Sequence, residues 1–324
     1  MRAVRVHEKG GPEVLQLEDA PEPELQSGEV LIRVHAVGVN FADHLMRIGA
    51  YPAGDPPIIP GLEAAGTVER VAPDVEGMRP GQRVMAWARR TYAELVAAPA
   101  WAIVPVPDGL SFEEAAAIPV AFGTAWHALV SLAALRPGER VLVHAAGSGV
   151  GSAAIQLARQ LGGRVIATAG QDWKLERAKQ LGAEGTVNYA TQDVAEEVRR
   201  LTDGGGVDIV LEGVGRATFP ASVRSLAFGG RAVIFGAPSG PRVELDTREA
   251  INRNLTFFGM SITTNPRFRQ TIQGFASEAL SWFESGALRP VIDHIYPLDR
   301  AGEAHQRVMD RDLFGKLVLT VAGA

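Results

Sequence analysis

The sequence contains no cysteine among its 324 residues. This absence excludes disulfide bonds, cysteine metal ligands and a catalytic thiol. Seven histidines remain, but none forms an H-E-x-x-H motif or another closely spaced ligand pair. We therefore interpret His44, His127 and His144 as packing or surface residues, and we expect no bound metal.

A positive net charge and long apolar runs are also missing. The formal net charge is −5, which does not favour nucleic acids or anionic membranes as partners. No apolar run approaches the roughly 20 residues that cross a bilayer, and residues 1–11 lack the apolar centre of a signal peptide. The length fits about two domains. We expect a cytoplasmic protein.

Residues 1 to about 110 read as β-rich. Segments 30–39, 64–71 and 82–88 alternate like strands between Pro and Gly turns. At Ser111 the S-x-x-E spacing of a capping box predicts the start of a helix. The tail from about 265 is mixed in character, and its last segment, 315–323, is expected to be a strand that returns to the N-terminal part.

The middle of the chain alternates strand-like and helix-like segments. The predicted strands are 140–146, 164–170, 186–190, 207–213, 231–238 and 255–261. Helical segments lie between most of them, at 151–162, 172–182, 194–204 and 219–230. This alternation predicts a parallel, doubly wound α/β sheet with right-handed crossovers.

The stretch HAAGSGVGSAAIQLA, residues 144–158, has the strand–turn–helix context of a phosphate-binding loop. Gly147, Gly149 and Gly151 remove side chains where the backbone must approach a pyrophosphate. The helix that begins near Val150 directs free N–H groups and its positive dipole end at the anion.

The turn departs from the G-x-G-x-x-G pattern, because Ala146 and Ser148 hold two of the three glycine places. A turn that binds nothing is one alternative. A nucleophile elbow, G-x-S-x-G, is another, but Ala146 and Val150 stand where its glycines belong. Ser148 is therefore not expected to be a hydrolase nucleophile, and we favour a dinucleotide loop of a variant type.

Several motifs together resemble one known family. They are AGSGVG (146–151), VGVNFADHLMRIGAYP (37–52), IPGLEAAGTV (59–68), AAAIPVAFGTAWHAL (115–129), LGAEGTVNY (181–189) and FGKLVL (314–319). Over nearly its whole length the chain resembles the zinc-free branch of the medium-chain dehydrogenase/reductase superfamily, the quinone oxidoreductase or zeta-crystallin-like group. The resemblance implies a Rossmann domain over 119–264, inserted into a β-rich GroES-like catalytic domain of 1–118 and 265–324, and a homodimer.

The resemblance also predicts that zinc is not used. Zinc-dependent relatives bind the metal through a Cys in the segment that matches 38–43 and a His-Glu pair in the segment that matches 61–63. Here those places hold Asn40 and Leu62-Glu63. Without a Lewis acid, the site suits a conjugated, electron-poor acceptor. The nicotinamide supplies the hydride, and the protein aligns it with the acceptor.

Active-site residues follow from the same resemblance. Asn40 is expected to bind the nicotinamide ribose or the substrate, and Tyr51 to orient or protonate the developing oxyanion. Asp43 and Arg47 lie on the same side, although their i, i+4 spacing also fits a simple ion pair. Tyr51 could instead be a loop aromatic beside Pro52, with solvent as the proton donor.

The expected cofactor is NADPH. No acid ends the second predicted strand, where NAD enzymes place one for the ribose 2′-OH, and Asp172 is interpreted as a helix N-cap. The resemblance places the NADPH-binding lysine at Lys174 and an adenine-side tyrosine at Tyr189. The other expected cofactor contacts are Asn40, Thr124, Gly147, Ser148, Gly149, Val150, Phe235, Gly236, Phe258, Ser261 and Lys316.

These features predict an NADPH-dependent quinone reductase. A reductase of activated C=C bonds in 2-alkenals or enones is the alternative on the same scaffold, and a nucleotide-binding protein without significant turnover is the alternative of another class. We expect the choice of small-molecule substrate to depend on loops near residues 40–60 and 265–290.

Overall fold

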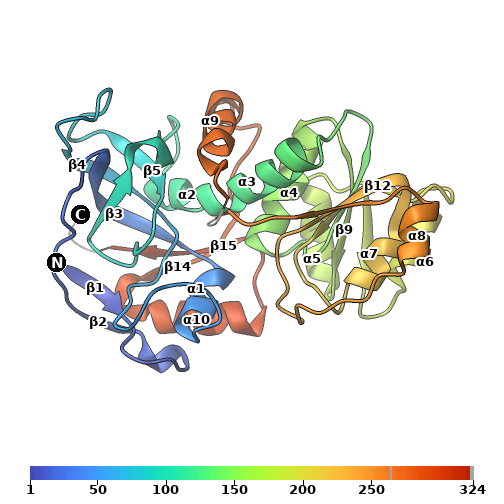
Figure 1. Cartoon of the computed structure of the whole chain (residues 1–324), viewed down its shortest axis with the longest axis horizontal. Helices are drawn as coiled ribbons and strands as arrows, with labels where there is room; N and C mark the ends of the chain where they lie inside the picture. The colour runs from blue at the N-terminus through green and yellow to red at the C-terminus, as the bar shows by residue number, and fades with distance from the viewer. Residues whose placement is uncertain (263–264, 322–324) are drawn as a thin grey trace. The chain divides into compact units, whose positions relative to one another are not determined.

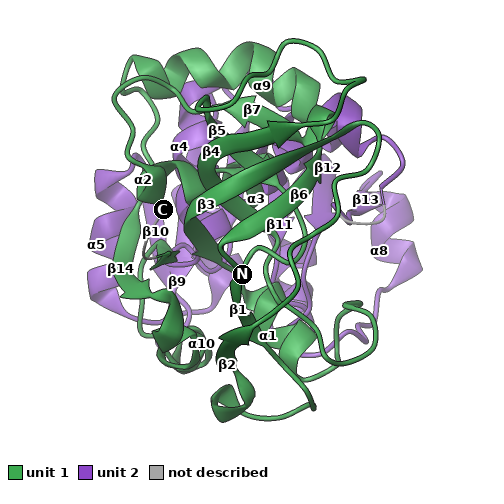
Figure 2. Cartoon of the chain, turned by 90° about the vertical axis from the view of Figure 1, so that its left-hand side faces the viewer, with its two compact units in different colours: residues 1–123, 272–324 green, residues 124–271 purple. Residues whose placement is uncertain are grey.

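The computed structural model describes residues 1–262 and 265–321 (Figure 1). The chain divides into two compact units, which Figure 2 shows in two colours. One unit combines residues 1–123 with 272–324, and the other is the continuous segment 124–271. The second unit is therefore inserted into the sequence of the first.

The first unit is built on a seven-stranded sheet of order β14-β15-β3-β4-β5-β7, with β6 also paired to β3. Strands β1 (Arg2–Arg5) and β2 (Gln16–Asp19) form a separate hairpin. The strands of the large sheet are β3 (Glu29–Val39), β4 (Glu63–Val71), β5 (Arg83–Trp87), β6 (Leu95–Pro99), β7 (Ile103–Pro105), β14 (Ile292–Pro297) and β15 (Lys316–Thr320). The three early strand predictions are confirmed. The tail strand is confirmed as well, because β15 pairs antiparallel with β3.

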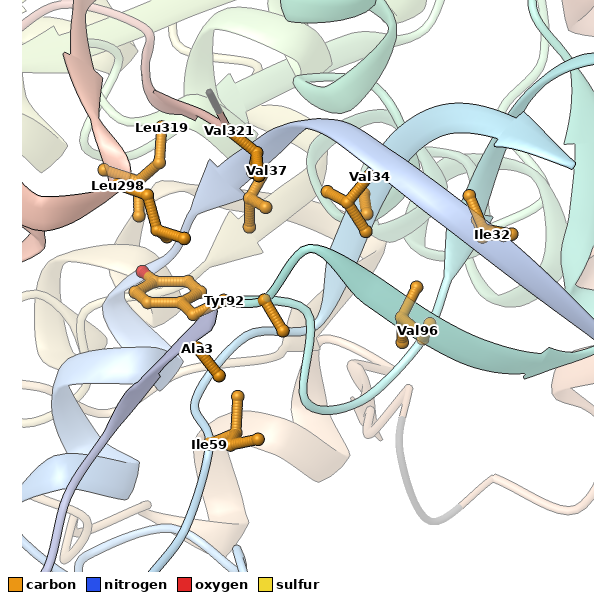
Figure 3. Close-up of a cluster of buried hydrophobic side chains, with 14 of the residues drawn as sticks. Ala3, Ile32, Val34, Val37, Ile59, Tyr92, Val96, Leu298, Leu319 and Val321 are labelled. Carbon is orange, nitrogen blue, oxygen red and sulfur yellow. The ribbon is translucent and has the colours of Figure 1, made fainter. Parts of the chain in front are cut away.

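A β-bulge in β3 decides which side chains of that strand face the core. Val34 pairs with Gly66 and Ala36 pairs with Ala65, so His35 has no opposite residue. Such an extra residue reverses the alternation of side chains beyond it. The buried cluster accordingly takes Val30, Ile32 and Val34 before the bulge but Val37 and Val39 after it; Figure 3 labels members of this cluster. The alternation therefore places Asn40, which follows Val39, on the opposite face.

The helices that belong to or border this unit are α1 (Phe41–Arg47), α2 (Phe112–Ala116), α3 (Pro119–Trp126), α9 (Phe268–Glu284) and α10 (Ala301–Asp310). The capping box at Ser111 is confirmed, since Ser111 Oγ accepts from the Glu114 N–H and the Glu114 carboxylate accepts from the Ser111 N–H. The expectation of a loop over 265–290 is wrong. Helix α9 fills most of it and buries an i, i+3/i+4 stripe of Phe268, Ile272, Phe275, Ala279 and Phe283.

The second unit carries an entirely parallel sheet of order β10-β9-β8-β11-β12-β13. Its strands are β8 (Arg140–Val143), β9 (Arg164–Ala169), β10 (Gly185–Asn188), β11 (Val207–Glu212), β12 (Leu226–Ile234) and β13 (Thr256–Gly259). The connecting helices are α4 (Gly149–Gln160), α5 (Asp172–Gln180), α6 (Val194–Leu201), α7 (Phe219–Ser225) and α8 (Thr247–Asn252). The doubly wound prediction is confirmed. The strand order reverses between β8 and β11, where such sheets bind ligands.

One predicted helix is shorter than expected. The segment 219–230 is helical only to Ser225, and β12 starts at Leu226. Gly229 has a φ of +74°, and neither Gly229 nor Gly230 favours helix continuation. Among the described residues, no helix is long and apolar enough to cross a membrane.

Candidate functional site

The glycine-rich turn of the second unit joins β8 to α4. Ser148 is the N-cap of α4, and its Oγ accepts a hydrogen bond of 2.9 Å from the Gly151 N–H. A Cβ on Gly151 would lie 2.3 Å from the carbonyl oxygen of Ala145, so the turn packs directly against the helix. The first N–H groups of the helix, at Gly149 and Val150, have no intrahelical partner. Together with the helix dipole, they form a cradle that fits a pyrophosphate.

The hydroxyl of Ser148 caps helix α4, and the nearby His144 contacts side chains other than Ser148. His144 Nδ1 lies 3.0 Å from Thr168 Oγ1, and His144 Nε2 lies 2.9 Å from Ser222 Oγ. Burial lowers the pKa of His144, against the opposing effect of the Glu212 carboxylate. The geometry gives the nucleophile-elbow alternative no support.

A buried carboxylate organises the end of β11. Glu212 accepts hydrogen bonds from the N–H groups of Val214 and Gly215 at 2.8 and 2.9 Å, and from the hydroxyls of Thr218 and Ser222. Ser222 in turn reaches His144 and thereby Thr168. This hydrogen-bonded chain ties the carboxyl ends of β8, β9 and β11 together, immediately beside the glycine turn.

The predicted adenine-side residues lie at the ends of β9 and β10. A Cβ on Gly170 would lie 2.8 Å from the ring of Tyr189, so that ring packs over a bare backbone, and Tyr189 remains half exposed. Lys174 is in the first turn of α5, where its ammonium stands 5.2 Å from the centroid of the Trp173 ring. The N-cap prediction for Asp172 is wrong. Gln171 is the N-cap, and the Asp172 carboxylate accepts from the Asn188 side chain at 2.6 Å.

The remaining predicted contacts of this unit are spread over several elements. Phe235 and Gly236 follow β12, Phe258 lies in β13, and Ser261 follows that strand. A Cβ on Gly236 would come within 2.7 Å of the Gly213 carbonyl, so the ends of β11 and β12 approach closely. Thr124 lies in α3 and is buried.

In the first unit, Asn40 is held by a buried ion pair that the sequence did not reveal. Lys316 Nζ donates to Glu63 Oε1 and Asn40 Oδ1, both at 2.7 Å, and to the Val39 carbonyl at 2.8 Å. Asn40 Nδ2 donates to Glu63 Oε1 at 2.8 Å and to the Gly38 carbonyl at 3.2 Å. These three side chains come together because they lie at the ends of adjacent strands. Strand β3 ends just before Asn40, β4 starts at Glu63 and β15 starts at Lys316.

A second buried polar group, the Asp43 carboxyl, contacts the backbone of Asn40. Asp43 Oδ2 accepts from the Asn40 N–H at 2.8 Å and from the Tyr92 hydroxyl at 3.2 Å, and that hydroxyl also lies 3.0 Å from His305 Nε2. Burial raises the pKa of Asp43 to about 7 and lowers the pKa of His305 to about 3. Neither Tyr92 nor His305 was predicted as a site residue.

The expected Asp43–Arg47 ion pair is not formed. Arg47 is 1% exposed, and its Nη2 contacts His44 Nδ1 at 2.9 Å and Met309 Sδ at 3.2 Å. Its Nε and Nη1 have no partner within the described residues. Burial lowers the pKa of Arg47.

Tyr51 lines a cavity of about 540 Å³ within this unit. The cavity walls also include Met46, the cations Lys9 and Arg47, and one acid, Asp55. The cavity thus combines apolar surface with one phenol and a small excess of positive charge.

The donors near Asn40 do not form a zinc site. The Glu63 carboxylate is committed to an ammonium, an amide and, at 2.7 Å, the Val120 N–H. Throughout 1–262 and 265–321, no group of three or more His, Cys, Asp or Glu residues is arranged to hold a metal ion.

Comparisons with known proteins identify the family of this chain. Residues 26–108 match the family model of the alcohol dehydrogenase GroES-like domain, and residues 149–277 match the model described as zinc-binding dehydrogenase. The chain is 35% identical to the quinone oxidoreductase of Mus musculus over 98% of this chain and 97% of that protein.

The chain is also similar to solved structures of oxidoreductases. An NAD-dependent alcohol dehydrogenase is 40% identical with a TM-score of 0.90, covering 99% of this chain and 100% of that one. The Escherichia coli quinone oxidoreductase in complex with NADPH is 30% identical with a TM-score of 0.91, at the same coverage. The expected enzyme class, an oxidoreductase, is in line with both structures, and the expected cofactor, NADPH, is in line with the Escherichia coli complex. The chain belongs to the zinc-free quinone oxidoreductase family of the medium-chain dehydrogenase/reductase superfamily and is an NAD(P)-dependent oxidoreductase.

Proposed function

We propose that this enzyme transfers a hydride from NADPH to a quinone. The observation that carries the proposal is the commitment of Glu63 and Asn40 to the Lys316 ammonium, in the segments where zinc-dependent relatives bind their metal. A quinone needs no Lewis acid, because the incoming charge spreads over its conjugated ring to a distant oxygen.

The second unit supplies the groups that would hold the cofactor. The N–H groups of Gly149 and Val150 suit the pyrophosphate, and the Tyr189 ring over Gly170 suits the adenine. Lys174 supplies a cation for the 2′-phosphate, and the end of β9 carries Ala169 and Gly170 rather than an acid. A carboxylate there would bind the 2′-hydroxyl of NADH and repel the 2′-phosphate.

The first unit supplies the groups that would meet the acceptor. Tyr51 lines the 540 Å³ cavity, where its phenol can donate a hydrogen bond to the oxygen that gains negative charge. NADPH would supply the hydride, and solvent can supply the one proton that a hydroquinone monoanion then needs.

The first experiment is the loss of nicotinamide absorbance when the protein is mixed with an ortho-quinone and NADPH, with NADH assayed in parallel. We expect rapid loss with NADPH and slow loss with NADH. Loss with a 2-alkenal but not with quinones would replace the proposal by C=C reduction. No loss with either acceptor would favour binding without turnover.

The cofactor assignment is tested by Lys174→Glu. We expect the dissociation constant for NADPH, measured by the fluorescence of the bound nucleotide, to rise at least about tenfold, because one charge-assisted hydrogen bond is worth about 1.5–3 kcal/mol. The constant for NADH should change little. Lys179→Glu is the matched control, since it makes the same charge change on the same helix, at a lysine paired with Glu176. Equal losses for both nucleotides would contradict the assignment.

A further inference from the structure

The side-chain amide of Asn40 contacts two groups with opposite hydrogen-bonding character. Lys316 is an ammonium and can only donate, whereas the Glu63 carboxylate can only accept. The ammonium lies 2.7 Å from Asn40 Oδ1, and the carboxylate lies 2.8 Å from Asn40 Nδ2. A flipped amide would place donor against donor and acceptor against acceptor. The orientation of Asn40 is therefore fixed by its neighbours.

The fixed orientation leaves Asn40 with acceptor capacity and no donor capacity. Its two N–H groups point to Glu63 Oε1 and to the Gly38 carbonyl. Its oxygen has two lone pairs, of which the Lys316 ammonium takes one. A bound molecule can therefore donate to Asn40, but it cannot receive a hydrogen bond from it.

The ion pair that imposes this orientation is itself held rigidly. The side chains of Lys316 and Glu63 are 5% and 0% exposed. All three N–H groups of Lys316 are used within the unit, and the second oxygen of Glu63 accepts from the Val120 N–H at 2.7 Å. A Cβ on Gly38 would lie 2.3 Å from Glu63 Oε1, so a bare backbone at this position makes room for the carboxylate.

We propose that Lys316 and Glu63 are positioning residues that lock Asn40 as a hydrogen-bond acceptor for a hydroxyl of the nicotinamide ribose. The inference rests on the proposed use of NADPH. The proposal assigns Asn40 to the ribose rather than to the substrate oxyanion, because an amide without a free N–H cannot donate a hydrogen bond to an oxyanion. Stabilising the oxyanion then falls to Tyr51 or to solvent. It also makes Lys316 act on the cofactor through Asn40 rather than by direct contact.

The test is a thermodynamic cycle read out as the dissociation constant for NADPH, measured by fluorescence without any acceptor. Lys316→Met/Glu63→Gln removes the ion pair without leaving a buried charge, and Asn40→Ala removes the acceptor. We expect about tenfold weaker binding for each, as for one lost hydrogen bond. Because both changes act through one contact, the triple variant should also be about tenfold weaker. A loss of about one hundredfold would overturn the proposal.

Cofactor analogues supply the second readout. The two NADPH analogues that lack the 2′- or the 3′-hydroxyl of the nicotinamide ribose are titrated in the same way. The wild type should bind one of them about tenfold more weakly than NADPH, and the ion-pair and Asn40 variants should lose this discrimination. Equal binding of NADPH and both analogues by the wild type would overturn the proposal.

The control is Arg231→Met/Glu139→Gln, which neutralises a partly buried ion pair at 2.6 Å beside the amino end of β8. This variant should bind NADPH and both analogues as the wild type does. Failure of the proposed reaction would appear separately, as NADPH binding that is intact in an enzyme inactive with quinones. A wild type that binds no NADPH would overturn both proposals.

Discussion

Asp43 shows how far one buried carboxyl can depart from its ordinary behaviour. It is fully buried, and its Oδ1 has no hydrogen-bond partner in the described chain. Burial raises its pKa to about 7, while the Asn40 N–H, Lys316 and the Tyr92 hydroxyl act in the opposite direction. The folded protein thus keeps this proton over a pH range in which the unfolded chain releases it.

This difference predicts a pH-dependent stability. The pKa of Asp43 is 3.8 in the unfolded chain and about 7 in the folded one. The proton that the folded protein holds more tightly therefore adds to the unfolding free energy in full below pH about 4, and this stabilisation is lost as the pH rises towards 7. Asp43→Asn cannot ionise. From pH 5 to pH 8, the unfolding free energy of the wild type should therefore fall by about 2–3 kcal/mol relative to that of the variant.

Urea unfolding of both proteins at several pH values checks this expectation. The lowered pKa of His305 affects the wild type and the variant alike, so it cancels in the difference. A difference that stays constant from pH 5 to pH 8 would mean that Asp43 is ionised in the fold.

At the residue level the sequence did not reveal which side chains contact one another. The motif around Asn40 predicts a site residue there but does not indicate that Lys316 and Glu63 hold its side chain. Asp43 and Arg47 were paired because they lie one helical turn apart, yet Asp43 contacts Tyr92, 49 positions away, and Arg47 contacts Met309, 262 positions away. The Lys316–Glu63 pair spans 253 positions. Local spacing carries no information about contacts that strand order creates.

Among the elements, the strands and the glycine turn were foreseeable and the bulge was not. Periodicity predicted β3, β4, β8, β9 and β11 because a buried strand leaves a pattern in its own residues. The extra residue at His35 leaves no such pattern, although it decides which face Asn40 occupies. Helix α9 did leave a pattern, and its apolar stripe could have been recognised in the sequence.

The close packing of the glycine turn predicts a steric effect of one methyl group. In Gly151→Ala the new Cβ would lie 2.3 Å from the Ala145 carbonyl oxygen, so the turn must shift. We expect the unfolding free energy to fall by about 1–3 kcal/mol and NADPH binding to weaken. Gly259→Ala is the control, because its Cβ would have no neighbour within 4 Å. Thermal unfolding of both variants makes the comparison, and equal, small effects would contradict the packing argument.

At the scale of the whole molecule, the family resemblance predicts a homodimer through late strands of the second unit. In the strand order, β13 is outermost and pairs with β12 on one side. Edge strands offer unpaired backbone groups to another chain. Large apolar side chains of the same unit are also exposed, with Phe228 at 71% and Ile251 at 70%.

Sedimentation should therefore give a mass twice that of the chain. Ile251→Asp should shift the equilibrium towards monomers, because it would bury a carboxylate in an apolar contact. Ile295→Asp, at an exposed isoleucine of the first unit, should leave the mass unchanged. A monomeric wild type would remove the dimer prediction.

The position of β15 after the second unit in the sequence has a consequence for biosynthesis. The segment 124–271 is complete in sequence while β14 and β15 still await translation, and domains that are complete can fold during synthesis. Lys316 reaches Val39 only after 277 further residues have been made. A nascent or prematurely terminated chain can therefore fold its nucleotide unit, but its Asn40 stays unanchored and its Glu63 lacks a counter-ion. Strand β15, which is made after the whole nucleotide unit, completes the anchoring of Asn40.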